Sequence, residues 1–159
     1  MATQEDFRVF MKSVSREAGI DALVPSEDGL MQLSAGDIEM GIQFIPTANK
    51  IFIYTEIGYL PDNAPSSIYR TLLFDQAAGH NTGGGSFALI KATGNLIYQL
   101  VWDFTPSEPA AFAQLLTNIL DFTSDWQNKL SAMLNGEEDT EDSDSGPELS
   151  FSELFTIRV

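Results

Sequence analysis

The chain has 159 residues, no cysteine, and 23 Asp and Glu against 8 Lys and Arg, for a formal net charge of −15. This length fits one domain with at most a short appendage, and 43% hydrophobic residues with eleven Phe are enough for a core. The negative charge disfavours nucleic acids and anionic lipid surfaces as partners. The lack of cysteine excludes disulfides, thiolate metal sites and thiol catalysis.

The N-terminus, MATQEDFRVF, has no basic region followed by an apolar core, so it does not resemble a signal peptide. No apolar run approaches the ~18 to 20 residues that a membrane-spanning helix needs. We therefore expect a soluble, cytoplasmic protein with no membrane partner.

Residues 3–18 are predicted to form the first helix. Thr3 can cap its N-terminus, with Asp6 three residues on, where a carboxylate also suits the positive helix end. One face carries Phe7, Phe10, Met11, Val14 and Ala18. A second row carries Arg8, Lys12 and Arg16. This row is either a solvated face or a basic patch that meets an acidic partner or the chain's own acidic segment.

Alternating apolar and polar residues predict three strands over residues 31–34, 37–44 and 50–57. The third strand is apolar on both faces, with Ile51, Ile53 and Ile57 on one and Phe52 and Tyr54 on the other. Two apolar faces indicate cover on both sides of this strand.

The segment from Pro65 to Phe104 is predicted to form a helix that Gly79 ends, a glycine-rich turn, and two strands over residues 86–91 and 96–104. The helix has two adjacent apolar rows, which are Ile68, Leu72 and Ala77, and Tyr69, Leu73 and Ala77. Because two rows are wider than one core contact needs, we expect this helix to meet two neighbours. We place a homodimer interface here, with contacts that include Ile68, Tyr69, Leu72 and Leu73.

Past the hairpin, residues 105–136 are predicted to form a long helix. Its apolar face carries Phe112, Leu115, Leu116, Ile119, Phe122, Trp126, Leu130 and Met133. The element order α-β-β-β-α-β-β-α predicts an α+β fold with a mostly antiparallel five-stranded sheet packed with helices. This domain should span residues 1–136.

The composition changes after the last helix. Residues 137–148 hold seven acids and no base, which predicts a disordered acidic linker. Residues 149–159 are apolar again, and Phe155, Ile157 and Val159 alternate as in a strand added to a sheet edge. This C-terminal segment either covers an apolar groove until a partner displaces it or packs as a structural strand.

Few residues support catalysis. His80 is the only histidine and lies in GHNTGGG, where a polar turn residue is the simplest interpretation. No GK[ST] follows these glycines and a strand comes next, so no phosphate cradle is predicted. The closest carboxylate pairs are Glu27 with Asp28 and Asp121 with Asp125, in a turn and on a helix surface. We expect no catalytic residue, metal site or cofactor, and therefore no enzyme.

The remaining candidate for a site is apolar surface. We expect a partner-binding patch that contains Phe7, Phe10, Phe52 and Tyr54, since exposed apolar patches mark interaction sites. The alternative is that these residues form ordinary core.

Four stretches, in this order, resemble the class I chaperones of bacterial type III secretion, the Tir-chaperone family. They are DALVPSEDGLMQLS, IFIYTEIGYLP, IYRTLLFDQAAGHNTGGGSFALIKATGNLIYQLVW and FAQLLTNILDFTSDWQNKL. They are similar to the family's opening strand, its third strand with a Gly-x-Leu-Pro exit, its second helix with the closing hairpin, and its last helix. The resemblance covers about residues 5–134.

The resemblance implies a cytoplasmic homodimer that holds the N-terminal segment of a secreted effector in extended, non-globular form, without ATP. The negative surface would keep such a complex soluble. Two other classes stay open. One is a structural or regulatory module that binds a folded partner, and the other is a small-ligand-binding domain, which would need a concave polar pocket.

Overall fold

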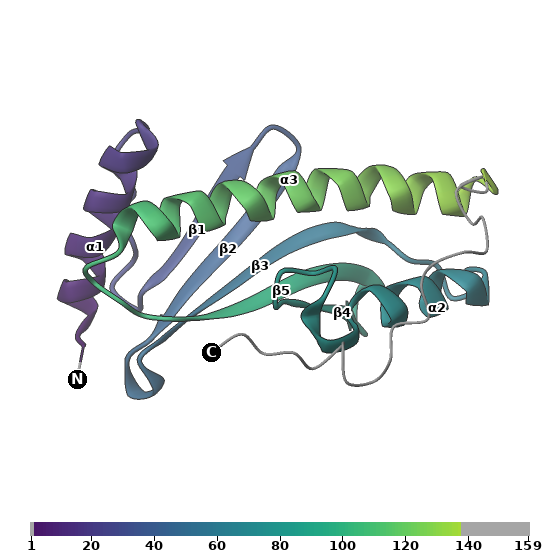
Figure 1. The fold of residues 1–159 in the computed structure, drawn as a ribbon, viewed down its shortest axis with the longest axis horizontal. Coiled ribbons are helices and arrows are strands. Elements are labelled where there is room, and N and C mark those ends of the chain that lie inside the picture. The colour runs from purple at the N-terminus through teal and green to yellow at the C-terminus, as the bar shows by residue number, and fades with distance from the viewer. Residues whose placement is uncertain (1, 138–159) are drawn as a thin grey trace.

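The structure is a computed structural model that describes residues 2–137 (Figure 1). Its helices and strands, in chain order, are α1 (Gln4–Ala18), β1 (Leu30–Ala35), β2 (Ile38–Ile45), β3 (Lys50–Tyr59), α2 (Ser66–Asp75), β4 (Ser86–Ile90), β5 (Asn95–Asp103) and α3 (Pro109–Leu134). The predicted element order and α+β class are confirmed. The predicted C-terminal segment, residues 149–159, and all but the first residue of the predicted acidic linker lie outside the described residues.

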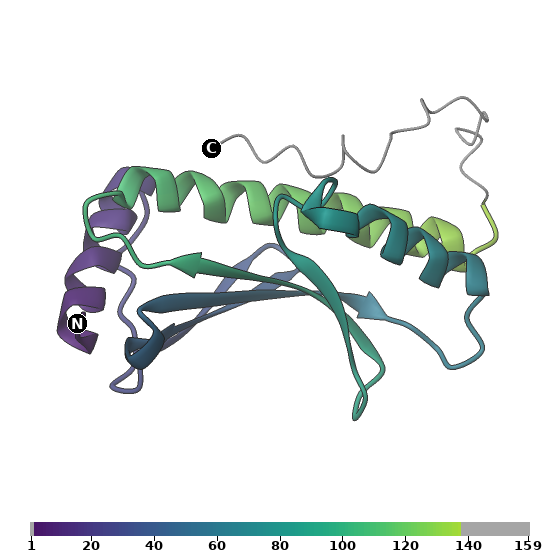
Figure 2. The ribbon, with the colours of Figure 1, turned by 60° about the horizontal axis from the view of Figure 1, so that its bottom comes forward.

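The five strands form one antiparallel sheet in the order β1-β2-β3-β5-β4. The strand alternation read from the sequence is present, because Ile53 pairs with Ile42 on β2 and with Leu100 on β5, and all three are buried. All three helices lie on one face of the sheet (Figure 2). In the described part of the chain, no helix covers the opposite face.

Local sequence specifies both ends of α1. The Asp6 N–H donates to Thr3 Oγ1 over 3.1 Å, and the Thr3 N–H donates to the Asp6 carboxylate over 2.7 Å. The bonds from Thr3 stabilise the charged carboxylate and hold the pKa of Asp6 below its usual value. The helix ends at Gly19, whose φ of 67° lies in the left-handed region that favours glycine.

The core lies between the helix-covered face of the sheet and helices α1 and α3. The Phe7 ring stacks on Phe44 of β2 with centroids 4.9 Å apart, and Phe10 meets Phe104 edge-on at 5.2 Å. Burying each such side chain contributes about 1.5–3 kcal/mol. These aromatic contacts therefore fix α1 across one end of the sheet (Figure 1).

α2 ends earlier than the sequence predicted. Its last residue is Asp75, and a 3₁₀ turn, Ala77–Gly79, follows in which Ala78 has a φ of 54°. The Asn81 N–H bonds to the Asp75 carbonyl oxygen over 3.2 Å, which closes the helix end in place of further helical bonds. Ala77, predicted for both apolar rows, is therefore outside the α-helix and exposed.

The glycine-rich turn packs against β5. The Tyr98 hydroxyl donates to the Thr82 carbonyl oxygen over 2.7 Å, and burial raises the pKa of the Tyr98 phenol. The Tyr98 ring lies so close to Gly85 that a side chain at this position would collide with it. Glycine here therefore allows the turn to approach the sheet.

α3 begins at Pro109, later than the predicted start at residue 105. Pro109 is in the first turn, where its fixed φ suits a helix start and its missing N–H is not needed. The helix then runs along the sheet for 26 residues and reaches from α1 to α2 (Figures 1 and 2).

Candidate functional site

The polar residues that the sequence offered for catalysis or metal binding lie on the surface of the described domain. His80 is exposed, and so are both of the carboxylate pairs that the sequence offered. No group of three or more His, Cys, Asp or Glu in this range could hold a metal ion. Over the same range, no helix combines the length and apolarity needed to cross a membrane. Two apolar surfaces are the candidate sites.

The first apolar surface lies on the sheet face that points away from the helices (Figure 2). We call it the open sheet face, and it consists of Leu30, Ile45, Phe52, Tyr54, Ile97 and Val101. Strand alternation places these side chains opposite the core residues of the same strands. Phe52, Tyr54 and Ile97 are half-buried, and the other three are exposed. An apolar sheet face of this kind has area to bury against a partner.

An aromatic pair on β3 forms the centre of the open sheet face. The Phe52 and Tyr54 rings lie 5.8 Å apart between centroids. Phe52 lies between Gln43 of β2 and Val101 of β5 in the strand register. Tyr54 lies over Gly41 of β2, where any side chain would collide with its ring. Gly41 thus allows the Tyr54 ring to rest against the neighbouring strand.

The structure does not bring the four residues of the predicted patch together. Phe7 and Phe10 are buried on the core side of α1, and Phe52 and Tyr54 lie on the opposite face of the sheet. The reason is that the apolar face of α1 packs on the helix-covered side of the sheet. Within residues 2–137, the predicted cover of β3 is present only on the side of Ile53, where the helices lie.

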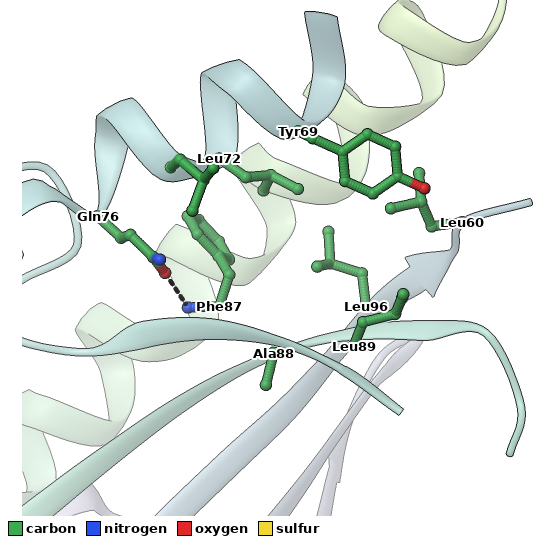
Figure 3. Close-up of a pocket in the computed structure, with 9 residues that line it drawn as sticks. Leu60, Tyr69, Leu72, Gln76, Phe87, Ala88, Leu89 and Leu96 are labelled. Atoms are coloured by element: carbon green, nitrogen blue, oxygen red, sulfur yellow. Dashed lines mark hydrogen bonds between the residues drawn. The ribbon is translucent and has the colours of Figure 1, made fainter. Parts of the chain in front are cut away.

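The second apolar surface is a groove between α2 and the β4–β5 hairpin (Figure 3). We call it the α2–β4 groove, with a volume of about 210 Å³ and a lining of Leu60, Tyr69, Leu72, Leu73, Gln76, Phe87, Ala88, Leu89 and Leu96. Leu73 is 64% exposed and Leu89 is 49% exposed. Leucines this exposed on both sides of a groove make it a candidate binding surface.

Apart from Ala77, the residues of both predicted rows lie on α2, but the two rows differ in burial. Ile68 and Leu72 are buried and hold the helix to its own core. Tyr69 and Leu73 face outward beside the groove. Phe74, which the sequence did not single out, is 78% exposed. The outer face of α2 available to a partner therefore consists of Tyr69, Leu73 and Phe74.

Polar contacts hold α2 in place beside the groove. The Phe87 N–H of β4 donates to Gln76 Oε1 over 2.9 Å (Figure 3). On the other side, Lys129 Nζ of α3 lies 3.1 Å from Asp75 Oδ2 and 4.6 Å from the centroid of the Trp126 ring. The ion pair is partly exposed and contributes on the order of 0–1 kcal/mol. Its main effect is geometric, since it ties the end of α2 to α3.

Sequence reasoning missed the part of the groove that the hairpin contributes. Leu89 and Leu96 were expected to line strand faces, and nothing local shows that α2 lies over them. The available signal was that both fall on the same face as Tyr98, which pairs with Phe87. That face continues past the edge of the core toward α2.

These features define a small α+β domain whose candidate sites are apolar surfaces. A model of the Tir chaperone protein (CesT) family matches residues 10–127. The chain therefore belongs to the Tir chaperone protein (CesT) family, and the resemblance seen in the sequence is confirmed. No curated protein sequence matches the chain significantly.

Solved structures share the fold at low sequence identity. A chain of the ExsC–ExsE complex gives a TM-score of 0.68 at 16% identity, with 80% of this chain and 96% of that chain covered. A chain of the HopA1–SchA chaperone–effector complex gives a TM-score of 0.65 at 11% identity, with 79% of this chain and 95% of that chain covered. The structure of the Yersinia pestis type III secretion chaperone SycH in complex with a stable fragment of YscM2 gives a TM-score of 0.61 at 15% identity. The match covers 76% of this chain and 98% of that chain.

Proposed function

We propose that this protein is a non-catalytic chaperone that binds the N-terminal segment of a type III secreted effector and keeps it soluble and secretion-competent. Membership of the Tir chaperone family supports this, as does a fold shared with a chaperone–effector complex. The observation that carries the proposal is the open sheet face, where Phe52 and Tyr54 present an aromatic surface that no helix covers within residues 2–137.

An extended effector segment suits this surface for physical reasons. Its apolar side chains can pack on the aromatic pair and on Val101, and burying each large one contributes about 1.5–3 kcal/mol. A segment laid out across the strands cannot at the same time form a core of its own. The bound segment therefore stays non-globular without any catalytic step.

The charge of the chain supports the same role. A net charge of −15 repels like-charged complexes from one another and from phosphate-rich surfaces. We place the protein in the bacterial cytoplasm, where an effector is held before export, with neither nucleic acid nor membrane as its partner.

We also propose a homodimer through the outer face of α2. Tyr69, Leu73 and Phe74 supply the contact surface, and the buried Ile68 and Leu72 support it from behind. Two such faces meeting around a twofold axis would cover the most exposed aromatic side chain of the helix, Phe74.

Affinity capture with the full-length protein from its native host tests the proposed function. The wild type should enrich a secreted protein through that protein's N-terminal segment. Phe52→Ser with Tyr54→Ser should bind the captured segment at least about tenfold more weakly, a loss of ~1.4 kcal/mol or more, because two aromatic contacts are removed and the core face is untouched.

Val9→Ser is the matched control, because Val9 is exposed on α1, and α1 lies on the other side of the sheet. Undiminished binding by the double variant would contradict the open sheet face as the site. Enrichment of a folded protein alone would favour a regulatory module instead.

A further inference from the structure

The α2–β4 groove has room for a large apolar side chain. A cavity of about 150 Å³ lined by apolar residues accepts benzene, and this groove measures about 210 Å³. Tyr69 and Leu73 form its wall on α2, and Leu89 forms its wall on β4. Because all three are exposed among the described residues, a ligand over them would remove apolar surface from water.

We propose that residues 149–159 of the same chain bind in the α2–β4 groove. Among the eleven residues of this segment are six large apolar ones, Leu149, Phe151, Leu154, Phe155, Ile157 and Val159. The inference goes beyond the proposed function, because it concerns a contact of the chain with itself and needs no effector.

The end of α3 lies close to the groove. Lys129, in the last two turns of this helix, contacts Asp75 at the end of α2, and α2 lies beside the C-terminal half of α3 in both views (Figures 1 and 2). Residues 137–148 lead from there to the apolar segment. A coil of twelve residues spans about 20 Å, which is more than the ~15 Å length of α2.

The ~20 Å span of residues 137–148 disfavours the other apolar surfaces as binding sites for the C-terminal segment. α1 lies at the far end of α3 (Figure 1), and a helix of 26 residues measures about 39 Å. The open sheet face is on the side of the sheet away from α3, so the chain would have to pass around a sheet edge. The groove is the apolar surface on the same side as the end of α3 and within its reach.

Two basic residues on or next to the groove elements are opposite in charge to the acidic residues 137–148. Arg70 follows Tyr69 on α2, and Lys91 follows the last residue of β4. Neither base forms an ion pair within residues 2–137. A positive charge beside the groove would attract the seven acids of residues 137–148, an effect that salt weakens.

Gln76 determines how the segment binds. The outward N–H of Phe87, on the edge strand β4, already donates to Gln76 Oε1 over 2.9 Å. This bond competes with strand addition along β4. The segment therefore inserts side chains such as Phe155 into the groove, instead of pairing as the edge strand that its alternation suggests.

The groove shares Tyr69 and Leu73 with the outer face of α2. A second copy of the chain and the C-terminal segment would therefore compete for the same residues. This consequence, unlike the binding itself, rests on the homodimer of the proposed function.

Disulfide trapping in the full-length chain tests the binding, and the absence of native cysteine makes every bond assignable. Leu73→Cys is combined with Phe155→Cys and oxidised mildly at low protein concentration. We expect an intramolecular disulfide at monomer mass in most of the protein. Two control pairs combine Phe155→Cys with Val101→Cys on the open sheet face or with Val24→Cys beyond α1, both at exposed positions.

The control pairs should remain largely reduced. Bonding at Val101 or Val24 to the same extent as at Leu73 would overturn the proposal, as would a Leu73 pair that stays reduced or that links only two chains. Neither result depends on an effector, so failure here is distinct from failure of the chaperone function.

Hydrogen exchange gives a second readout that needs no cysteine. Phe155→Ser with Ile157→Ser in the full chain should speed exchange several-fold in α2 and β4, and the control Thr156→Ser should not. The samples are kept at a protein concentration low enough for sedimentation to show monomer, because a second copy of the chain would cover the same residues. Unchanged exchange in the double variant would also overturn the proposal.

Discussion

Two threonine hydroxyls meet in the otherwise apolar core between β3 and α3. Thr123 Oγ1 donates to the Ile119 carbonyl oxygen over 2.7 Å, and Thr55 Oγ1 lies 2.7 Å from Thr123 Oγ1. Because Thr123 has a single hydroxyl proton, Thr55 must be the donor of the bond between them. Both side chains are buried, so an unpaired hydroxyl here has no water to replace its partner.

Because of this donor order, substituting Thr123 and substituting Thr55 should lower the free energy of unfolding by different amounts. Thr123→Val leaves the Thr55 hydroxyl without an acceptor and should lower the free energy of unfolding by about 1–3 kcal/mol. Thr55→Val should cost less, because Thr123 keeps its bond to Ile119. The double variant should cost less than the sum of the two, as measured by urea unfolding. Equal and additive losses would contradict this donor order.

At the residue scale, the sequence predicted what depends on near neighbours. The Thr3 and Asp6 capping pair and the alternation of Ile53 with Phe52 are local patterns, and the structure has both. Alternation shows that Phe52 and Ile53 lie on opposite faces, but not which face a helix covers. That depends on α3, which begins more than fifty residues later, and so Phe7 and Phe52 were wrongly combined in one patch.

At the scale of elements, the two faces of α2 differ in burial, and we assign them different roles. The inner row, Ile68 and Leu72, is buried in its own domain, whereas Leu73 and Phe74 point away from it. The predicted dimer interface included both rows because periodicity cannot tell an inner row from an outer one. Substitutions that test the interface therefore belong on the outer row only.

Leu73→Asp with Phe74→Asp should shift the protein from dimer to monomer. Placing two charges in an apolar contact removes burial worth about 1.5–3 kcal/mol for each side chain and adds the desolvation of the carboxylates. Sedimentation velocity measures the mass, and Val9→Asp on α1 is the control for charge alone. An unchanged dimer in the double variant would contradict this interface, and Leu72→Asp is uninformative because it would disturb the core.

The α2–β4 groove could not be predicted from the individual helices and strands, because it forms where α2 meets the hairpin. Its α2 wall lay within the predicted rows, but Leu89 and Leu96 come from the hairpin that follows. Their meeting depends on α2 being tied to α3 by Lys129 and to β4 by Gln76. These contacts join residues that are distant in sequence and leave no periodic pattern.

At the scale of the whole molecule, the helices lie on one side of the sheet and leave the aromatic pair on the other (Figure 2). Because of this asymmetry, three different parts of the molecule can be assigned three different roles. The covered face supplies stability through the core, the open face is proposed for the effector segment, and α2 with its groove is proposed for contacts between or within copies of the chain. Their separation would let an effector bind without disturbing the dimer.

We propose that an unfolded effector segment binds by apolar contact with the open sheet face. Calorimetric titration of the full-length protein with the N-terminal segment of the captured effector, and with the folded remainder of that effector, tests this binding. We expect the segment alone to bind, with a negative heat-capacity change from apolar burial and an affinity that survives about 0.5 M salt, where charges are strongly screened. Binding of the folded remainder alone, or loss of binding at that salt concentration, would contradict the claim, and the latter would point instead to Arg8, Lys12 and Arg16 on α1.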